Sequence, residues 1–204
     1  MLPLFEIPQL RRNRDDNQNS EKIRLDMKPD KTLSSKIVFE GRAVKLRVDT
    51  IQMPDGRQTT REIVEHGACI AVVAIDKDNN ILLVSQYREA VGKELLEIPA
   101  GGVDPGEDVE AAVKREMQEE TGYLPQKLVN LGGYYLAPGY STEDLHLYLA
   151  EDLITSRLVA EDTEGITVVR VPVSQIRKLL NSGKICDGKS IAGLYTFLEY
   201  RKKH

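Results

Sequence analysis

The sequence predicts an α/β (α+β) fold in which a mixed β-sheet lies between helices and a region of antiparallel strands comes first. Three observations predict this class. Runs rich in Val and Ile fill residues 36–99, a strong helical segment follows at 108–121, and strand-like runs then precede two helices near the end of the chain. Strands, one helix, more strands and two helices are the order expected when helices cover both faces of a sheet.

The chain of 204 residues has the length of one domain with an appendage. Residues 1–35 are dense in Arg, Asp, Asn, Lys and Ser, and their scattered apolar residues follow no period. Such a composition indicates a polar tail or a loosely docked arm. We therefore expect the domain itself at residues 36–204.

The centre of the sheet is expected at two neighbouring apolar runs. Residues 68–75 (ACIAVVAI) are apolar at both odd and even positions, which is typical of a strand covered on both faces. A turn signal, Asp78-Asn79-Asn80, separates this run from a second strand at 81–86.

The helix at 108–121 contains good helix formers and no Pro or Gly before Gly122. The later elements follow from the same kinds of pattern. Strands are expected at 126–136, 145–150 and 166–173, and helices at about 173–180 and 190–201.

Composition and charge exclude several functional classes. Apolar residues make up 41% and charged residues 29% of the chain, as in a globular protein, and the formal net charge is -4. This charge offers no general attraction to nucleic acid or anionic lipid, and no apolar run approaches the ~18 residues of a membrane span. The two cysteines lack the Cys/His spacing of a metal site and favour a cytoplasmic protein, and the three histidines are expected to be structural or exposed.

Two glutamates break the packing rules of the predicted helix. With about 100° per residue and Val109 and Val113 facing inward, Glu116 and Glu120 fall on the same inward stripe. Buried carboxylates need a neutralising partner, and oxygen ligands without Cys or a nearby His favour Mg²⁺ or Mn²⁺ over Zn²⁺. The alternative is a solvated acidic helix end whose period is shifted by one residue.

The residues around these glutamates form a spaced motif. In GGVDPGEDVEAAVKREMQEETGY, residues 101–123, Gly101 is followed after five residues by Glu107, and after seven more by Arg115-Glu116 and the run that ends in Gly122. This segment resembles the Nudix box at every fixed position of that family's pattern. The resemblance implies a Nudix-type mixed sheet between helices, and a loop-helix-loop that holds metal against a diphosphate.

The resemblance also implies roles for the residues of the motif. Glu116, Glu119 and Glu120 are expected to bind Mg²⁺ or Mn²⁺ together with the Ala100 backbone carbonyl, with Glu116 and Glu120 the most dependable. Residues expected to be mainly structural are Gly101, Glu107, Arg115 and Gly122. An ordinary (i, i+4) pair of Arg115 with Glu119 is compatible with that structural role.

Features outside the motif narrow the resemblance to the ADP-ribose pyrophosphatase subfamily, over residues 36–191. Pro138 lies sixteen residues past Gly122, and TTREIVEHGACIAVVAI, VSQYRE and ELLEIPAGG are similar to the same group. By this resemblance Arg61 and Glu62 contact the adenosine part and Arg88 a phosphate, although each has an alternative as an exposed strand charge. The other expected substrate contacts are Gly102, and Ser141 and Glu143 at the terminal ribose.

The implied reaction is hydrolysis of ADP-ribose to AMP and ribose 5-phosphate. A general base is expected in the loop AEDTEGI, with Glu164 as first choice, as base or as a further metal ligand, and Glu161 and Asp162 as rivals. An exposed acidic loop without such a role is the alternative. The family resemblance further implies a homodimer, and Phe39, Tyr87 or another aromatic would stack on adenine.

Three other functions compete with this reaction. GKICDGKS, residues 183–190, satisfies the phosphate-loop pattern, but a helix-like segment and not a strand precedes it, so a connection between helices is expected there. A nucleotide-sensing domain without activity would be expected to lose motif carboxylates, and all of them are present. Hydrolysis of another sugar nucleotide, such as GDP-mannose or UDP-glucose, or of a dinucleotide stays open.

Overall fold

A computed structural model of the chain describes residues 29–160 and 165–204. By its contacts the chain divides into two compact units, Met1–Val64 and Glu65–His204. The division lies between residues 64 and 65, and the domain start expected at residue 36 stays a prediction.

The described part of the first unit is a three-stranded sheet with the order β1-β2-β3. Its strands are β1 (Lys31–Glu40), β2 (Lys45–Gln52) and β3 (Gln58–Glu65), and β1 runs antiparallel to β2. A turn at Pro54-Asp55-Gly56 joins β2 to β3, with Gly56 at a φ of 87°. Because β1 begins at Lys31, residues 31–35 belong to a strand, although they lie within the stretch expected to be a polar tail.

The second unit contains a seven-stranded mixed sheet among its described residues, with the central order β10-β5-β4-β9-β8. β4 runs parallel to β9 and antiparallel to β5, and two short strands, β6 and β7, pair with β5 and β4. The strands are β4 (Cys69–Ile75), β5 (Asn80–Arg88), β6 (Lys93–Glu97), β7 (Ala100–Gly102), β8 (Tyr123–Tyr135), β9 (Asp144–Thr155) and β10 (Thr167–Pro172).

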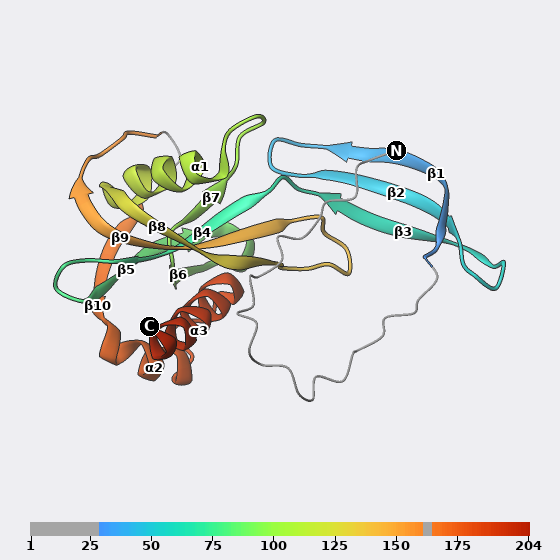
Figure 1. The fold of residues 1–204 in the computed structure, drawn as a ribbon. Coiled ribbons are helices and arrows are strands. Elements are labelled where there is room, and N and C mark those ends of the chain that lie inside the picture. Colours follow the sequence, from blue (N-terminus) through green and yellow to red (C-terminus); the bar gives the residue numbers. More distant parts are fainter. Residues whose placement is uncertain (1–28, 161–164) are drawn as a thin grey trace. The chain divides into compact units, whose positions relative to one another are not determined.

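The central strand β4 is buried on both faces, as its apolar residues at odd and even positions predict. Ala71 and Val73 belong to one hydrophobic cluster, together with residues of α2 (Val173–Asn181) and α3 (Gly188–Lys203). Ile70 and Val72 belong to the other cluster, together with residues of α1 (Val109–Glu116). Figure 1 shows α1 on one side of this sheet and α2 and α3 on the other. The predicted fold class, a mixed sheet between helices, is therefore confirmed.

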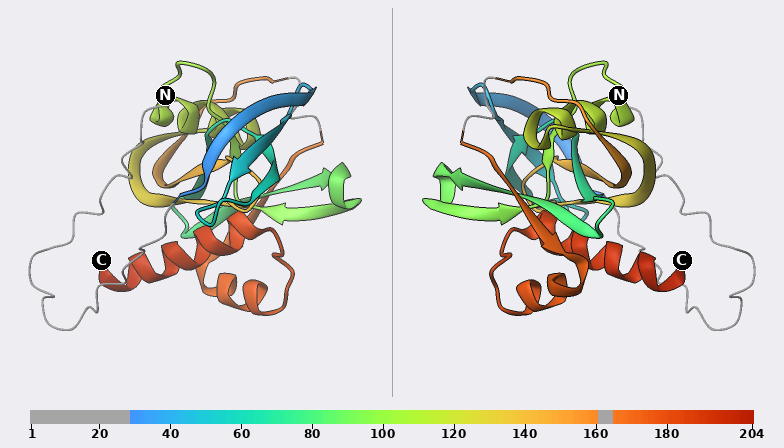
Figure 2. Two further views of the ribbon diagram at one scale, coloured as in Figure 1. Left: turned by 90° about the vertical axis from the view of Figure 1, so that its right-hand side faces the viewer. Right: turned by 90° about the vertical axis from the view of Figure 1, so that its left-hand side faces the viewer.

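The helix α3 packs closely on the sheet through a small residue. A Cβ atom at Gly193 would lie 2.8 Å from Ile98 Cδ1 and 3.0 Å from Leu147 Cδ1, so glycine allows the helix to approach. Both views in Figure 2 show α3 on the side of the sheet away from α1. Asp187 is the N-cap of α3 and accepts a hydrogen bond from Ser190 N at 2.9 Å, which confirms the connection between helices predicted for residues 183–190.

Among residues 29–160 and 165–204, no helix combines the length and the apolar character that crossing a membrane requires.

Candidate active site

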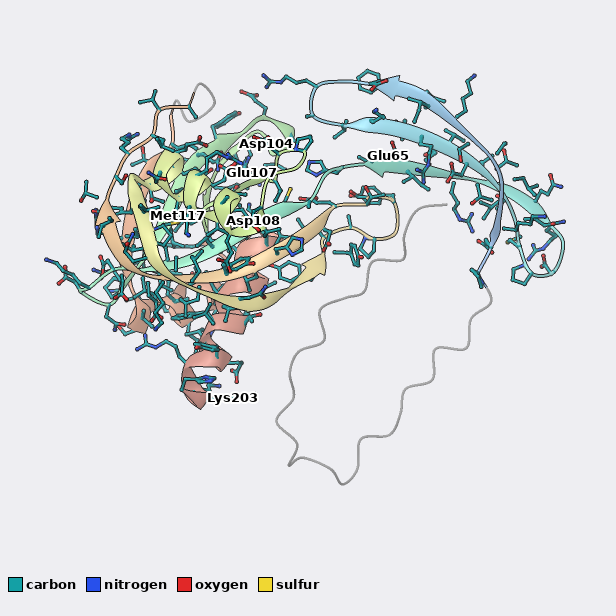
Figure 3. All side chains as sticks on the ribbon, turned by 45° about the horizontal axis from the view of Figure 1, so that its top comes forward. Glu65, Asp104, Glu107, Asp108, Met117 and Lys203 are labelled. Carbon is teal, nitrogen blue, oxygen red and sulfur yellow. The ribbon has the colours of Figure 1, made fainter. Side chains whose placement is uncertain are left out.

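The predicted metal-binding motif forms where β7 meets the helical segment. After α1 the chain continues as a π-helical turn, η2 (Met117–Thr121). This helical segment ends at Gly122, which has a φ of 78°. Figure 3 labels Asp104, Glu107 and Asp108 before α1 and Met117 where α1 ends. Asp108 caps α1 by accepting hydrogen bonds from Glu110 N and Ala111 N, so the helix starts one residue after it.

Glu116 lies directly against Gly101 of β7. A Cβ atom at Gly101 would lie 2.0 Å from Glu116 Cδ and 2.1 Å from Glu116 Oε1, so no side chain fits there without moving the carboxylate. The absence of a side chain at Gly101 therefore lets the Glu116 carboxylate approach the backbone of the β7 loop.

Glu120 is a buried carboxylate in the same place. It is 7% exposed, and its Oε2 accepts a hydrogen bond from Ala100 N at 3.1 Å. Burial raises the pKa of Glu120 to about 8; the negative charge of Glu116 adds to the shift, and the bond from Ala100 opposes it. A bound cation would relieve this unfavourable burial.

Arg115 organises the remaining carboxylates. Its Nε and Nη2 donate to the two oxygens of Glu107 at 2.9 Å each, and Nη1 donates to Glu116 Oε1 at 2.6 Å and to Glu119 Oε2 at 3.2 Å. Nη2 also donates to Gly102 O at 2.8 Å. The hydrogen bonds from Arg115 lower the pKa of Glu107. One guanidinium thus ties the β7 loop to the helix.

The donor set suits a hard divalent cation. Glu116 and Glu120 both approach the loop at residues 100–101, one against Gly101 and the other at Ala100 N, and Glu119 is 15% exposed beside them. Carboxylate and carbonyl oxygens are the ligands that Mg²⁺ and Mn²⁺ prefer. These three glutamates and the Ala100 carbonyl could therefore hold such an ion.

Arg88 lies in an ion-pair network that the sequence reasoning missed. Its Nε and Nη2 donate to the two oxygens of Glu97 at 2.9 and 2.7 Å, and Glu97 is only 1% exposed. Lys189 of α3 donates to Glu97 Oε2 and, at 3.0 Å, to Asp187 Oδ2. Burial alone would raise the pKa of Glu97, but the hydrogen bond from Arg88 and the charge of Lys189 outweigh it, so the pKa is lowered. The proposed phosphate contact of Arg88 stays a prediction.

Ser141 and Glu143 lie in the connection between β8 and β9, and Glu143 N donates to Ser141 Oγ at 3.2 Å. The structure brings Glu143 together with Cys69 and His66, whose ligand atoms all lie within 4.8 Å of one another. Burial, and then the charge of Glu143, raises the pKa of the Cys69 thiol to about 12. This grouping differs from the expectation that neither cysteine has metal-type partners. The spacing His66-x-x-Cys69 was the available signal.

The remaining predicted residues belong to β1 and β3 of the first unit, to β5 of the second unit, or to segments outside the described residues. Arg61 and Glu62 are exposed on β3 of the first unit, and Arg61 Nη2 lies 3.9 Å from Asp30 Oδ2. Phe39 and Tyr87, the candidates for adenine stacking, are 56% and 57% exposed. The candidate bases Glu161, Asp162 and Glu164 lie outside the described residues.

A cavity of about 660 Å³ lies in the second unit and touches the motif only at its last residue, Tyr123. Its lining includes Asp76, Tyr123 and Arg170, and none of the described site residues lines it. Arg170 Nη2 donates to Tyr123 Oη at 2.7 Å, so two of its polar groups already satisfy each other. The carboxylate site therefore stays the candidate active site.

Each of the two units matches the model of a known protein family. The family model described as "NUDIX domain" matches residues 65–192, and the one described as "Nucleoside diphosphate sugar hydrolase N-terminal domain" matches residues 31–64. The boundary between the two matches coincides with the division between the two units of the structure.

Individual proteins are similar over most of the chain. The methanol dehydrogenase activator of Bacillus methanolicus is 34% identical over 178 residues, covering 86% of this chain and 96% of that protein. The ADP-ribose pyrophosphatase of Bacillus subtilis (strain 168) is 33% identical over 163 residues, covering 79% and 88%. The crystal structure of an ADP compounds hydrolase shares the fold, with a TM-score of 0.80 and 23% identity over 87% of this chain and 96% of that one. The resemblance seen in the sequence is confirmed, and the protein belongs to the Nudix family.

Proposed function

We propose that this protein hydrolyses the diphosphate of a nucleoside diphosphate sugar in a metal-dependent reaction, with ADP-ribose as substrate and AMP and ribose 5-phosphate as products. One observation carries the proposal: in a Nudix chain, Glu116 and the buried Glu120 both lie against the loop at residues 100–101. Burying carboxylates costs free energy, and a bound cation would offset that cost.

The residues of the motif would have different roles in metal binding. Glu116, Glu119 and Glu120 would hold Mg²⁺ or Mn²⁺ with the Ala100 carbonyl. A divalent ion supplies electrophilic stabilisation of the diphosphate and lowers the pKa of a water. Arg115 would keep Glu116 and Glu119 in place through its hydrogen bonds of 2.6 and 3.2 Å.

We place the general base in the segment after β9, with Glu164 as first choice, as base or further ligand, and Glu161 and Asp162 as rivals. Described residues before this segment support the assignment, because they bond to the end of the motif helix. Ser156 N donates to Gly122 O at 2.9 Å, and Gln118 Nε2 donates to Ser156 Oγ at 2.8 Å.

The substrate class is supported by the match of residues 31–64 to a nucleoside diphosphate sugar hydrolase domain and by the relative named ADP-ribose pyrophosphatase. We further propose that Arg61 and Glu62 contact the adenosine part, Arg88 a phosphate, and Gly102, Ser141 and Glu143 the rest of the substrate. Another sugar nucleotide or a dinucleotide is the alternative substrate, and a nucleotide-sensing domain is the alternative function.

The test is product analysis with a panel of nucleoside diphosphate derivatives, with and without Mg²⁺. We expect ADP-ribose to give AMP and ribose 5-phosphate only when the metal is present. Glu116→Gln and Glu120→Gln should each lower turnover by about 100-fold or more while the circular dichroism spectrum stays unchanged, because each removes a charged metal ligand. Glu110→Gln is the matched control, since Glu110 is an exposed carboxylate in the first turn of the same helix.

The outcomes separate the parts of the proposal. Turnover at the wild-type rate in either glutamine variant would remove the metal site. Binding of ADP-ribose without any product would favour the sensing function. A faster reaction with GDP-mannose would make GDP-mannose, and not ADP-ribose, the assigned substrate. Full activity of Glu164→Gln would remove only the assignment of the base.

A further inference from the structure

Three side chains with different ligand atoms meet at the N-terminal ends of β4 and β9. His66 and Cys69 belong to β4 and the residues just before it, and Glu143 precedes β9 by one residue. One ligand atom from each lies within 4.8 Å of the other two, and Cys69 Sγ lies 3.7 Å from His66 Nδ1.

The backbone holds this group together through bonds that do not involve the three side chains. Thr142 Oγ1 accepts a hydrogen bond from His66 N at 2.9 Å and donates one to His66 O at 3.0 Å. Cys69 is the register partner of Leu145 in the parallel β4–β9 pair. Glu143, between these two anchors, is therefore fixed opposite His66 and Cys69.

The geometry points to a cation. Zinc bonds to sulfur at about 2.3 Å and to imidazole nitrogen at about 2.0 to 2.1 Å, so a tetrahedral ion separates these two atoms by about 3.5 Å. The observed 3.7 Å between Cys69 Sγ and His66 Nδ1 needs almost no movement to match. Glu143 supplies a third ligand of the kind found in zinc sites.

We propose that His66, Cys69 and Glu143 form a second cation site, which takes a borderline-soft divalent ion such as Zn²⁺. The donor sets of the two sites select different ions: a thiolate with an imidazole selects zinc, whereas Glu116 and Glu120 offer only oxygen. Cys69 is buried, but His66 and Glu143 are both partly exposed, so an ion can reach the group from solvent. The fourth position stays open to water.

Binding requires defined proton movements. The Cys69 thiol releases its proton to solvent as the metal–sulfur bond forms. His66 Nδ1 lies 2.9 Å from Gly67 O and can donate to it when it carries the imidazole proton. Coordination through Nδ1 therefore moves the imidazole proton to Nε2, and the ring stays neutral.

The test uses the full chain saturated with Mg²⁺ and titrated with Co²⁺, a spectroscopic substitute for Zn²⁺. We expect one equivalent of Co²⁺ to produce a thiolate charge-transfer band that Zn²⁺ abolishes. Cys69→Ser should lose the band, and His66→Ala and Glu143→Ala should bind Co²⁺ about 10-fold or more weakly. Glu143 is partly exposed, so its variant tests the site without disturbing the core.

Three matched controls keep the two sites apart. Cys186→Ser, at the exposed free cysteine, and His146→Ala should keep the band and the affinity. Glu120→Gln should also keep both, even if the proposed hydrolysis is lost. A wild-type protein without the band, a band that survives Cys69→Ser, or equal weakening by Glu120→Gln would overturn the second site.

Discussion

Gly101 shows how a single missing side chain can define a binding site. Gly101→Ala would place a methyl group where the Glu116 carboxylate lies, 2.0 Å from its Cδ atom. We expect the affinity for Mn²⁺ to fall about 10-fold or more, because the carboxylate must move away from the loop. The free energy of unfolding should change by less than the free energy of Mn²⁺ binding. A calorimetric titration with Mn²⁺ measures this.

Gly102→Ala is the control for that variant, because a Cβ atom at Gly102 meets nothing within 4 Å. Its Mn²⁺ affinity should stay within about twofold of the wild type, since no ligand is displaced. Equal loss in both variants would mean that the loop backbone, and not the Glu116 carboxylate, responds to the added methyl group.

The raised pKa of Glu120 predicts how metal binding depends on pH. Its pKa of about 8 means that the metal-free protein holds a proton there at neutral pH, which the cation must displace. The Mn²⁺ affinity should therefore rise about tenfold per pH unit below pH 8 and level off above it. An affinity independent of pH in a series of titrations would contradict this, and Glu120→Gln should lose this component of the pH dependence.

The same group has the opposite effect on the stability of the metal-free protein. Because folding raises the pKa of Glu120 from 4.5 to about 8, the folded state binds the proton more tightly than the unfolded state. The contribution of Glu120 to the free energy of unfolding is therefore largest below about pH 4.5 and is lost as the pH rises towards 8. A bound metal ion takes the place of the proton and restores the contribution of Glu120 to the free energy of unfolding.

Residues close in the sequence could be predicted, and residues joined by long-range pairing could not. A period of about 100° per residue places Glu116 and Glu120 with the buried Val113, and the structure agrees. The pairing of Arg88 with Glu97 depends on the register of β5 with β6. No local pattern contains that register.

At the level of elements, the end of the motif helix differs from a regular α-helix. η2 is π-helical, and the Thr121 hydroxyl donates to the Met117 carbonyl one turn before it. The sequence predicts one continuous helix, because π-turns have no clear composition signal. The wider turn keeps Met117 fully buried in the core while Glu120 reaches the loop at Ala100.

The packing of α3 on the sheet depends on Gly193. Gly193→Ala would bring a methyl group within 2.8 Å of Ile98 and 3.0 Å of Leu147. Although alanine favours a helix, overpacking should lower the free energy of unfolding by about 1 to 3 kcal/mol, measured by urea denaturation. These contacts are the ends of side chains, so the protein should still fold.

Gly188→Ala, in the first turn of α3, is the matched control. A Cβ atom at Gly188 meets nothing within 4 Å, so only the conformational freedom of the chain changes. We expect the stability to stay equal or to rise by up to about 1 kcal/mol. A loss at Gly188 as large as that at Gly193 would rule out packing as the cause.

At the scale of the whole molecule, strand β1 predicts association between chains. All ten of its residues are exposed, and they include Leu33, Ile37 and Phe39 at 41%, 43% and 56%. Strands with such exposed apolar side chains commonly pair with another chain. We therefore expect a homodimer in light scattering, and Phe39→Ser should shift it towards monomer. Ile154→Ser, 49% exposed in the second unit, should leave the dimer intact.

The sequence predicts the central strand of the second unit, but it does not predict which side chains from distant segments meet there. Residues 68–75 are apolar at both parities, which is sufficient to place a central strand between two layers of helices. The parallel pairing of β4 with β9 brings Cys69 level with Leu145, and this contact joins distant parts of the sequence. The grouping of Glu143 with His66 and Cys69 follows from that pairing, so sequence periodicity could not predict it.

The network around Glu97 predicts that three positions, on three different elements, change together in evolution. Its buried carboxylate is balanced by cations from two other elements, Arg88 of β5 and Lys189 of α3. Losing one cation alone leaves an inadequately compensated charge in the interior, which is more harmful than replacing the whole group by apolar residues. Among homologous chains, we therefore expect the three residues to be kept or replaced together, so that the contact of α3 with β5 and β6 is inherited as one unit.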